Sequence, residues 1–168
     1  MKVDVAIIGG GPAGLATAIG AALRGLSVAV FDKQRFPIDK ACGEGLMPSG
    51  LAALERLGAL KFLDRAESAP FRSITYVQES GVRAVGVLPA PGGLGVRRLA
   101  LSQALVERAG EVGVVLRPGC GVREHRHVEG SVETRLGLGD PLGHVLGRRL
   151  GRLEGFVLAG LRQQGMHL

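Results

Sequence analysis

The first part of the chain alternates short apolar runs with polar or glycine-rich turns. Residues 3–8 are mostly apolar and stop at three glycines in a row, which is typical of a strand buried on both faces of a parallel sheet. Residues 13–23 are rich in Ala and Leu and end before a glycine, which predicts a helix. A second apolar run covers residues 26–31. The pattern predicts a strand–helix–strand unit whose two strands are parallel.

Local patterns continue as far as residue 116. The predicted elements are, in chain order, a loop over 32–45, a helix over 48–57 ended by Gly58, a β-hairpin with strands 71–77 and 82–88, a connection over 89–95, a helix over 99–109 and a strand over 112–116. The hairpin is predicted from alternating β-branched residues around Glu79-Ser80-Gly81. Together these elements predict an α/β fold, a parallel sheet with helices and an inserted β element over 71–88.

The sequence changes character in its carboxy-terminal part. All four histidines lie there, no lysine does, and glycine recurs among leucine and arginine. Residues 120–128 and 131–136 predict two paired strands, whereas residues 137–168 show neither clear alternation nor helix caps, so we predict no element there. We expect one domain over residues 1–118 and an atypical Gly/Leu/Arg-rich tail over residues 119–168.

Composition narrows the classes of protein that the chain can be. A length of 168 residues with 46% hydrophobic and 4% aromatic side chains suits one domain whose core is built from Ala, Val, Leu and Ile. The formal charge of +6 is scattered along the chain, without an interleaved aromatic platform. We therefore expect a solvated basic surface and no nucleic-acid partner, although an anionic small cofactor would suit the same charge.

Cysteine usage and the amino terminus bear on the compartment. Cys42 and Cys120 lie far apart without C-x-x-C spacing, which indicates neither a disulfide framework nor a zinc site. The amino terminus lacks the long apolar region of a signal peptide, and no stretch approaches transmembrane length. We expect a cytoplasmic protein without a membrane span.

The candidate chemistry lies in the first turn, Gly9-x-Gly11-x-x-Gly14. Alone, this motif is weak in a chain with 28 glycines. Here a predicted strand precedes it, a predicted helix follows it, and the next strand ends at the acidic residue Asp32, so the combination indicates a dinucleotide site. Gly9 permits the tight turn, Gly11 lets the backbone approach a pyrophosphate, and Gly14 lets the helix pack closely on the strand.

The acidic residue and the helix N-terminus complete the predicted nucleotide site. The helix offers unpaired N–H donors to phosphate groups, and the carboxylate of Asp32 can accept hydrogen bonds from both ribose hydroxyls. A free carboxylate there disfavours the 2′-phosphate of NADP. A glycine-rich turn without a ligand is the alternative, and the motif by itself does not distinguish FAD from NAD.

Three segments carry a resemblance to a known family. They are residues 4–15 (DVAIIGGGPAGL), residues 39–46 (DKACGEGL), and residues 95–98 leading into Leu101 and Leu105. In this order they resemble the FAD-dependent oxidoreductases that include aromatic hydroxylases of the para-hydroxybenzoate hydroxylase type, flavin halogenases and geranylgeranyl reductases. The middle segment is most similar to the geranylgeranyl reductase-like members. The resemblance implies a Rossmann-like FAD/NAD(P)-binding fold and FAD as the cofactor.

The same resemblance implies further contacts to the cofactor. In the family, the loop after the acidic residue passes near the flavin, and an arginine that opens a later helix reaches the pyrophosphate or ribityl region. Arg98 matches this arginine best and Arg97 is the alternative; simple decoration of a helix N-terminus is disfavoured for a cation. The candidate cofactor-binding residues are Gly9, Gly11, Pro12, Ala13, Gly14, Asp32, Lys33, Cys42, Gly43 and Arg98.

Other polar residues give no catalytic assignment. Cys42 is either a redox thiol or a small residue packed at a turn, and the second is favoured because no resolving cysteine is near. Glu44 is either a surface carboxylate or a group near the substrate. His125 and His127 share one face of a strand, but two ligands do not make a metal site, so we expect no metal.

The resemblance implies an enzyme. Its members take hydride from NAD(P)H and then hydroxylate an aromatic substrate or reduce an isoprenoid double bond. The resemblance covers residues 3–118 and fades afterwards, where the family's later Gly-Ala-Asp-Gly-like and Gly-Asp segments are not found. We therefore expect a fold incomplete at the C-terminus, without the last FAD motif and the substrate domain, as truncation or a frameshift would leave. The alternatives are a non-catalytic nucleotide-binding remnant and an NAD-dependent dehydrogenase domain; the oligomeric state is not predicted.

Overall fold

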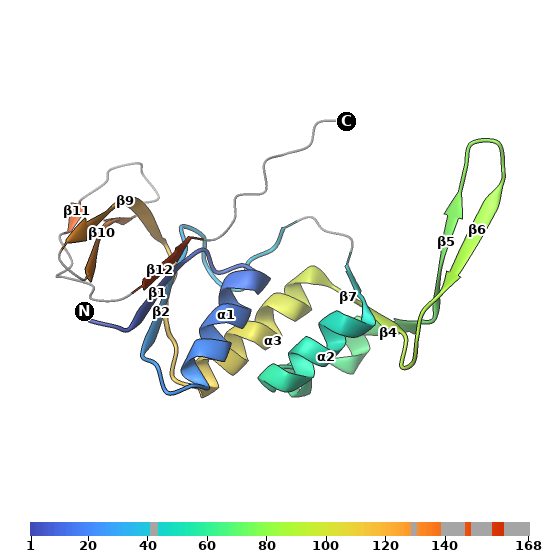
Figure 1. The fold of residues 1–168 in the computed structure, drawn as a ribbon, viewed down its shortest axis with the longest axis horizontal. Helices are drawn as coiled ribbons and strands as arrows, with labels where there is room; N and C mark the ends of the chain where they lie inside the picture. Colours follow the sequence, from blue (N-terminus) through green and yellow to red (C-terminus); the bar gives the residue numbers. More distant parts are fainter. Residues whose placement is uncertain (41–43, 129–130, 139–146, 149–155, 160–168) are drawn as a thin grey trace.

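The computed structural model of the chain describes residues 1–40, 44–128, 131–138, 147–148 and 156–159. Its centre is a parallel sheet with the strand order β12-β1-β2-β8 (Figure 1). The four strands are β1 (Val5–Ile8), β2 (Val28–Phe31), β8 (Val115–Arg117) and β12 (Phe156–Ala159). The predicted α/β class with a parallel sheet is confirmed.

The two central strands are apolar because they are covered on both faces. β1 pairs with β2 so that Val5 lies opposite Val28 and Ile8 opposite Phe31, and all four residues of β2 are buried. On its other side β1 pairs with β12, where Val5 lies opposite Phe156. β12 belongs to the stretch for which the sequence predicted no element. A strand this short has too few residues to show a period of its own.

Three helices gather beside one face of this sheet, and α1 and α3 lie side by side (Figure 1). They are α1 (Pro12–Ala22), α2 (Pro48–Leu57) and α3 (Arg98–Glu111). α2 ends at Gly58, whose φ of 69° is the left-handed conformation that glycine adopts at little cost, as the sequence predicts. Among the described residues, no helix combines the length and the apolarity needed to cross a membrane.

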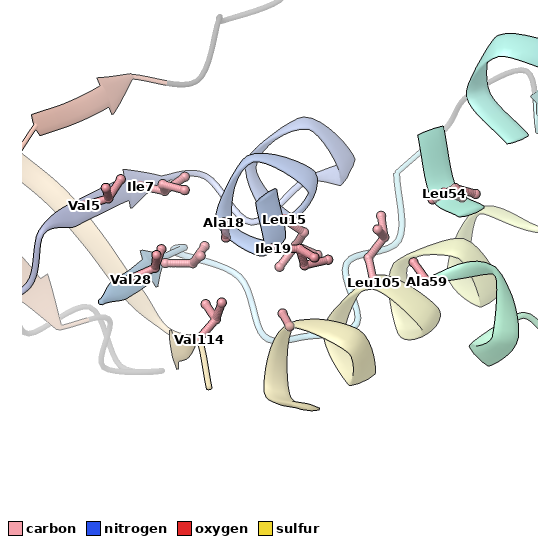
Figure 2. Close-up of a cluster of buried hydrophobic side chains, with 12 residues drawn as sticks. Val5, Ile7, Leu15, Ala18, Ile19, Val28, Leu54, Ala59, Leu105 and Val114 are labelled. Atoms are coloured by element: carbon pink, nitrogen blue, oxygen red, sulfur yellow. The ribbon is translucent and has the colours of Figure 1, made fainter. Parts of the chain in front are cut away.

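The main core lies between the sheet and these helices (Figure 2). Alternate residues of the strands point to this side, because successive side chains of a strand face opposite ways. The fully buried members include Ile7, Leu15, Ile19, Val30 and Leu105. Small alanines of α1 and α3 let the two helices approach each other, as expected for a core with few aromatic rings.

The opposite face of the sheet is covered by a second, smaller cluster. It contains Ala6, Ala29 and Phe31 from the sheet together with Cys120, which opens β9 (Cys120–Val128). β9 pairs antiparallel with β10 (Ser131–Leu138), and β10 pairs with β11 (Gly147–Arg148). The predicted pairing of two strands after residue 119 is confirmed. The expected domain boundary after residue 118 stays a prediction.

A small antiparallel sheet joins the loop after β2 to the start of α3. Its strands, in spatial order, are β3 (Gly45–Leu46), β7 (Gly93–Val96) and β4 (Ser68–Phe71). Two short 3₁₀ helices, η1 (Leu60–Phe62) and η2 (Arg65–Glu67), lead from α2 into β4. The prediction of a plain connection over residues 89–95 was wrong from Gly93 onwards. β7 requires glycine at position 93, because a Cβ there would lie 2.3 Å from the Phe71 ring.

The predicted hairpin is confirmed and extends away from the body of the molecule (Figure 1). It consists of β5 (Ser73–Val77) and β6 (Arg83–Val87), with Ser73 opposite Val87. The Gln78 N–H donates to the carbonyl of Val82 at 2.9 Å and so closes the turn. Its apolar side chains are largely exposed, with Val87 at 80% and the single tyrosine, Tyr76, at 70%.

Candidate cofactor site

The site is built around the turn between β1 and α1. Gly9 has a φ of 105°, a conformation that favours glycine. A Cβ on Gly14 would lie 1.9 Å from the carbonyl oxygen of Gly9, so only glycine lets the helix approach the turn this closely. A Cβ on Gly11 would meet no atom within 4 Å. The turn is therefore closed towards the strand and open at Gly11.

The N-terminus of α1 begins at this open position. Gly11 is the N-cap residue and has no side chain to cap the helix, and Pro12 follows as the first helical residue. The first helical hydrogen bond there is donated by Leu15 to the carbonyl of Gly11 at 2.9 Å. An N-terminus without a side-chain cap directs its N–H groups and the positive end of the helix dipole outwards. This arrangement suits an anionic group such as a phosphate.

Asp32 follows β2 and is tied to the glycine turn. Its Oδ2 accepts a hydrogen bond from the Gly10 N–H at 2.7 Å, and its Oδ1 accepts one from the Gln34 N–H at 2.8 Å. Each carboxylate oxygen keeps a second acceptor position, which can take a hydroxyl donor. Lys33, the next residue, is exposed. The carboxylate is thus fixed next to the turn.

Sequence reasoning missed the role of Gly10. We treated it as a variable position of the motif, whereas a Cβ there would lie 2.2 Å from Cε1 of the Phe36 ring. Its N–H also donates to Asp32. Three successive glycines were the available signal, since a variable position of the motif need not be glycine.

Two long-range hydrogen bonds fasten the loop after Asp32 to α3. The Ile38 N–H donates to the hydroxyl of buried Ser102 at 2.9 Å. Further along, the Arg98 N–H donates to Oε1 of Glu44, also at 2.9 Å. The loop is therefore attached to the first turns of α3 at Ile38 and Glu44, and the two acceptors, Ser102 and Glu44, were not among the candidate cofactor-binding residues.

The two candidate arginines have different surroundings. The Arg97 side chain is 73% exposed, and its Nε lies 3.1 Å from Oε2 of Glu67. Arg98 is only 7% exposed, and its buried Nη1 has no hydrogen-bond partner among the described residues. A buried guanidinium nitrogen without a partner is costly, so this one is poised for an anionic ligand. Of the two, Arg98 fits the role that the resemblance implies.

A hollow lies beside the loop, next to Arg97. It has a volume of about 510 Å³ and is lined by Asp39, Glu44, Asp64, Glu67 and Arg97 among others. A second hollow of about 310 Å³ shares Glu44, Glu67 and Arg97 with it. Its carboxylates make this surface unsuitable for a diphosphate.

Several of the remaining candidates lie outside the part of the chain that the structure describes. Cys42 and Gly43 lie outside the described residues, and so do the side-chain surroundings of His127; His125 is exposed. In the described part of the chain, no group of three or more His, Cys, Asp or Glu residues is placed to hold a metal ion. Hydrogen bonds from Ser27 lower the pKa of Asp4, and those from Lys61 and Arg108 lower the pKa of Glu111; neither carboxyl group belongs to the site.

Comparison with known proteins bears on the glycine turn and the loop. Residues 4–44, which hold the turn, Asp32 and Glu44, match the family model described as FAD dependent oxidoreductase. The resemblance to FAD-dependent oxidoreductases is confirmed. This match covers β1, α1, β2 and the following loop.

Two curated relatives of this chain are named menaquinone reductase. That of Mycolicibacterium smegmatis is 41% identical over 96 residues, which are 54% of this chain and 21% of the relative. That of Mycobacterium tuberculosis strain H37Rv is 33% identical over 166 residues, which are 88% of this chain and 41% of the relative. The chain thus spans less than half the length of either relative. An alignment over 88% of the chain also extends past residue 118, where we expected the resemblance to fade.

Solved flavoprotein structures share the fold. The flavin-dependent brominase Bmp2 superposes with a TM-score of 0.78 at 22% identity, over 97% of this chain and 39% of that one. The flavin-dependent monooxygenase PieE, in complex with FAD and substrate, superposes with a TM-score of 0.74 at 19% identity. The superposition covers 96% of this chain and 31% of that one. A geranylgeranyl bacteriochlorophyll reductase-like protein from Thermoplasma acidophilum superposes with a TM-score of 0.71 at 20% identity. The superposition covers 94% of this chain and 38% of that one. The predicted Rossmann-like flavoprotein fold is confirmed.

Proposed function

We propose that the chain binds FAD and forms the nucleotide-binding part of an FAD-dependent oxidoreductase. The observation that carries the proposal is the open space at Gly11, at an N-terminus of α1 that no side chain caps. Asp32 is held beside the same turn, and Arg98 supplies a buried positive charge whose Nη1 has no hydrogen-bond partner among the described residues. These three features suit a dinucleotide such as FAD: the N-terminus of α1 and Arg98 suit its diphosphate, and Asp32 suits its ribose.

Each residue has a defined task in this proposal. The N-terminus of α1 binds the diphosphate, with Pro12 and Ala13 as the residues against it, and Asp32 accepts from the ribose hydroxyls. Arg98 neutralises the diphosphate or the ribityl region. Following the resemblance, Lys33 contacts the adenosine half, and Cys42 and Gly43 lie beside the flavin. When bound, FAD supplies hydride transfer between a reduced nicotinamide, which we propose as donor, and the substrate.

The substrate class follows from the relatives. We propose reduction of an isoprenoid compound of the menaquinone type, because the two menaquinone reductases align with 54% and 88% of this chain, longer stretches than the 41% that aligns with the squalene epoxidase below. Aromatic or isoprenoid oxygenation is the second candidate, supported by a squalene epoxidase of Aspergillus fumigatus that is 38% identical over 69 residues. For this small-molecule chemistry we propose a cytoplasmic location, in keeping with the absence of paired cysteine motifs.

The first test is retention of flavin. The purified chain is incubated with FAD and desalted, and its absorption is recorded at the flavin bands near about 375 and 450 nm. We expect retained bands in the wild type and in Gly110→Val, and their loss in Gly11→Val and Asp32→Ala. Gly110 is a matched control because a Cβ there also meets no atom within 4 Å, at the far end of α3.

The outcomes separate the alternatives. A colourless wild type that binds NAD instead favours a dehydrogenase domain, and one that binds neither nucleotide favours a non-catalytic remnant. Bands that persist in Gly11→Val contradict the proposed site, since a valine side chain would occupy the space assigned to the diphosphate. With flavin retained, bleaching by NADH or NADPH identifies the donor, and a menaquinone that restores the colour supports the reductase assignment.

A further inference from the structure

Glu44 is held in an unusual backbone conformation. Its φ of 48° lies in the left-handed region, and among the described residues no other non-glycine residue has a positive φ. The surrounding structure enforces this conformation. The Val96 N–H donates to the Glu44 carbonyl at 2.7 Å, and the following residue, Gly45, pairs with Gly95 of β7. Strain of this kind persists only where neighbouring contacts determine it.

The conformation directs the Glu44 carboxylate to the N-terminus of α3. There Oε1 accepts the hydrogen bond from the Arg98 N–H. Arg97, the N-cap residue of α3, makes no side-chain cap of its own. Glu44, 54 positions earlier in the chain, therefore takes the place of a local cap and brings a negative charge to the positive end of the helix dipole.

The residue fixed by this bond is Arg98, whose buried Nη1 finds no hydrogen-bond partner in the part of the chain that the structure describes. A hydrogen bond at the Arg98 N–H fixes the position from which its side chain leaves the helix. We propose that Glu44 is a positioning residue that holds the guanidinium of Arg98 towards the diphosphate of bound FAD. The proposal rests on the proposed function, and it assigns Glu44 neither of the roles that the sequence left open.

Coulomb interactions and a positioning role predict opposite effects of removing Glu44 on FAD binding. Glu44 is a negative charge near the binding site of a negatively charged cofactor, so its removal would tighten FAD binding if only Coulomb interactions counted. A positioning role predicts that its removal weakens FAD binding. Glu67 is a suitable control because it lines the same hollows and carries the same charge but pairs with exposed Arg97.

The experiment measures the Kd for FAD by flavin fluorescence in the full chain. Glu44→Gly deletes the carboxylate while suiting the positive φ, so the variant is expected to fold, which thermal unfolding checks. We expect its Kd to rise about tenfold, the size of a lost helix cap. Glu44→Gln, whose amide oxygen can accept the same hydrogen bond, should stay within about threefold of wild type, and Glu67→Ala should not weaken binding.

A double-variant cycle shows whether Glu44 acts through Arg98. On the Arg98→Ala background, Glu44→Gly should have no further effect on the Kd, because the group that it positions is gone. The inference is overturned if the effects of Glu44→Gly and Arg98→Ala on the Kd for FAD are fully additive. It is also overturned if Glu44→Gly binds FAD as tightly as wild type, or if Glu67→Ala weakens FAD binding equally. Should Glu44→Gly not fold, Glu44→Asn replaces it, since asparagine tolerates this φ and its side chain is one carbon shorter. A wild-type chain that binds no FAD overturns the proposed function itself.

Discussion

The N-termini of α1 and α3 differ in how their free backbone N–H groups find hydrogen-bond partners. Each exposes backbone N–H groups that need partners, and neither has a capping side chain on its own N-cap residue. At α3 the carboxylate of Glu44 supplies the partner from a distant loop. At α1 the space in front of Gly11 is left open. The difference separates an N-terminus that stabilises the protein from one that is available to a ligand.

The largest expected effect comes from closing the approach of α1 to its turn. Gly14→Ala places a Cβ 1.9 Å from the Gly9 carbonyl oxygen, and neither backbone segment can yield without distorting the turn. We expect a loss of about 3 kcal/mol or more in the free energy of unfolding, measured with urea, together with loss of FAD binding.

Gly20→Ala in the same helix is the control for this prediction. Its Cβ would lie 3.6 Å from the Arg24 Nη1, an ordinary contact. It should stabilise the protein by up to about 1 kcal/mol through higher helix propensity. Equal destabilisation by the two substitutions would show that helix composition, and not the close approach, sets the requirement for glycine.

The charge beside α3 is expected to have the next largest effect. Arg98→Met keeps the apolar stem and removes a guanidinium that lacks a partner at Nη1, so the free energy of unfolding should not fall. FAD binding should weaken about ten- to a hundredfold, the range for a hydrogen bond to a charged group, as measured by fluorescence titration. Arg97→Met should change the Kd little, because its exposed ion pair with Glu67 is weak. The reverse ranking would transfer the cofactor role to Arg97.

The second anchor of the loop should matter for stability. Ser102→Ala leaves the buried N–H of Ile38 without its acceptor, and we expect a loss of about 1–3 kcal/mol in urea unfolding. Thr17→Ala removes a hydroxyl that donates within α1 at an exposed position and should change stability by less than about 0.5 kcal/mol. A Ser102→Ala variant as stable as Thr17→Ala would mean that water replaces the lost acceptor.

The smallest effect concerns a carboxylate that binds backbone outside any helix. Asp4 accepts from the Ser27 hydroxyl at 2.6 Å and from the Ser27 N–H at 2.8 Å, and these bonds lower the pKa of Asp4 below its ordinary value. Because the folded pKa is depressed, this stabilisation is present above the ordinary aspartate pKa and is lost as pH falls through the folded pKa. Unfolding measured from pH 7 to pH 3 should therefore be less pH-dependent in Asp4→Asn; equal slopes would contradict the assignment.

The parts of the site that the sequence predicted depend on local backbone chemistry. The requirement for glycine at positions 9 and 14 and the acidic residue after β2 follow from neighbours in the chain. The structure places them as predicted, although their contacts to a cofactor stay predictions. The exposed hairpin was equally predictable, since its turn and alternation lie within one short segment.

The parts that the sequence did not predict depend on contacts between distant positions. Glu44 and Arg98 are 54 positions apart, and Ile38 and Ser102 are 64 apart, so no local period relates them. β7 was missed because its glycines resemble a loop in the sequence, and the Phe71 ring that packs on Gly93 comes from a distant strand. Only the folded loop shows that one carboxylate serves a helix 54 residues further on.

The exposed hairpin also makes the chain a selective optical probe. The protein has no tryptophan and a single tyrosine, and that tyrosine lies on β5 with 70% of its surface exposed. Tyrosine emission therefore reports on the hairpin and not on the core or the glycine turn. Any surface that covers β5 and β6 would change this emission without a label, whereas binding confined to the distant turn would not shield the ring from solvent.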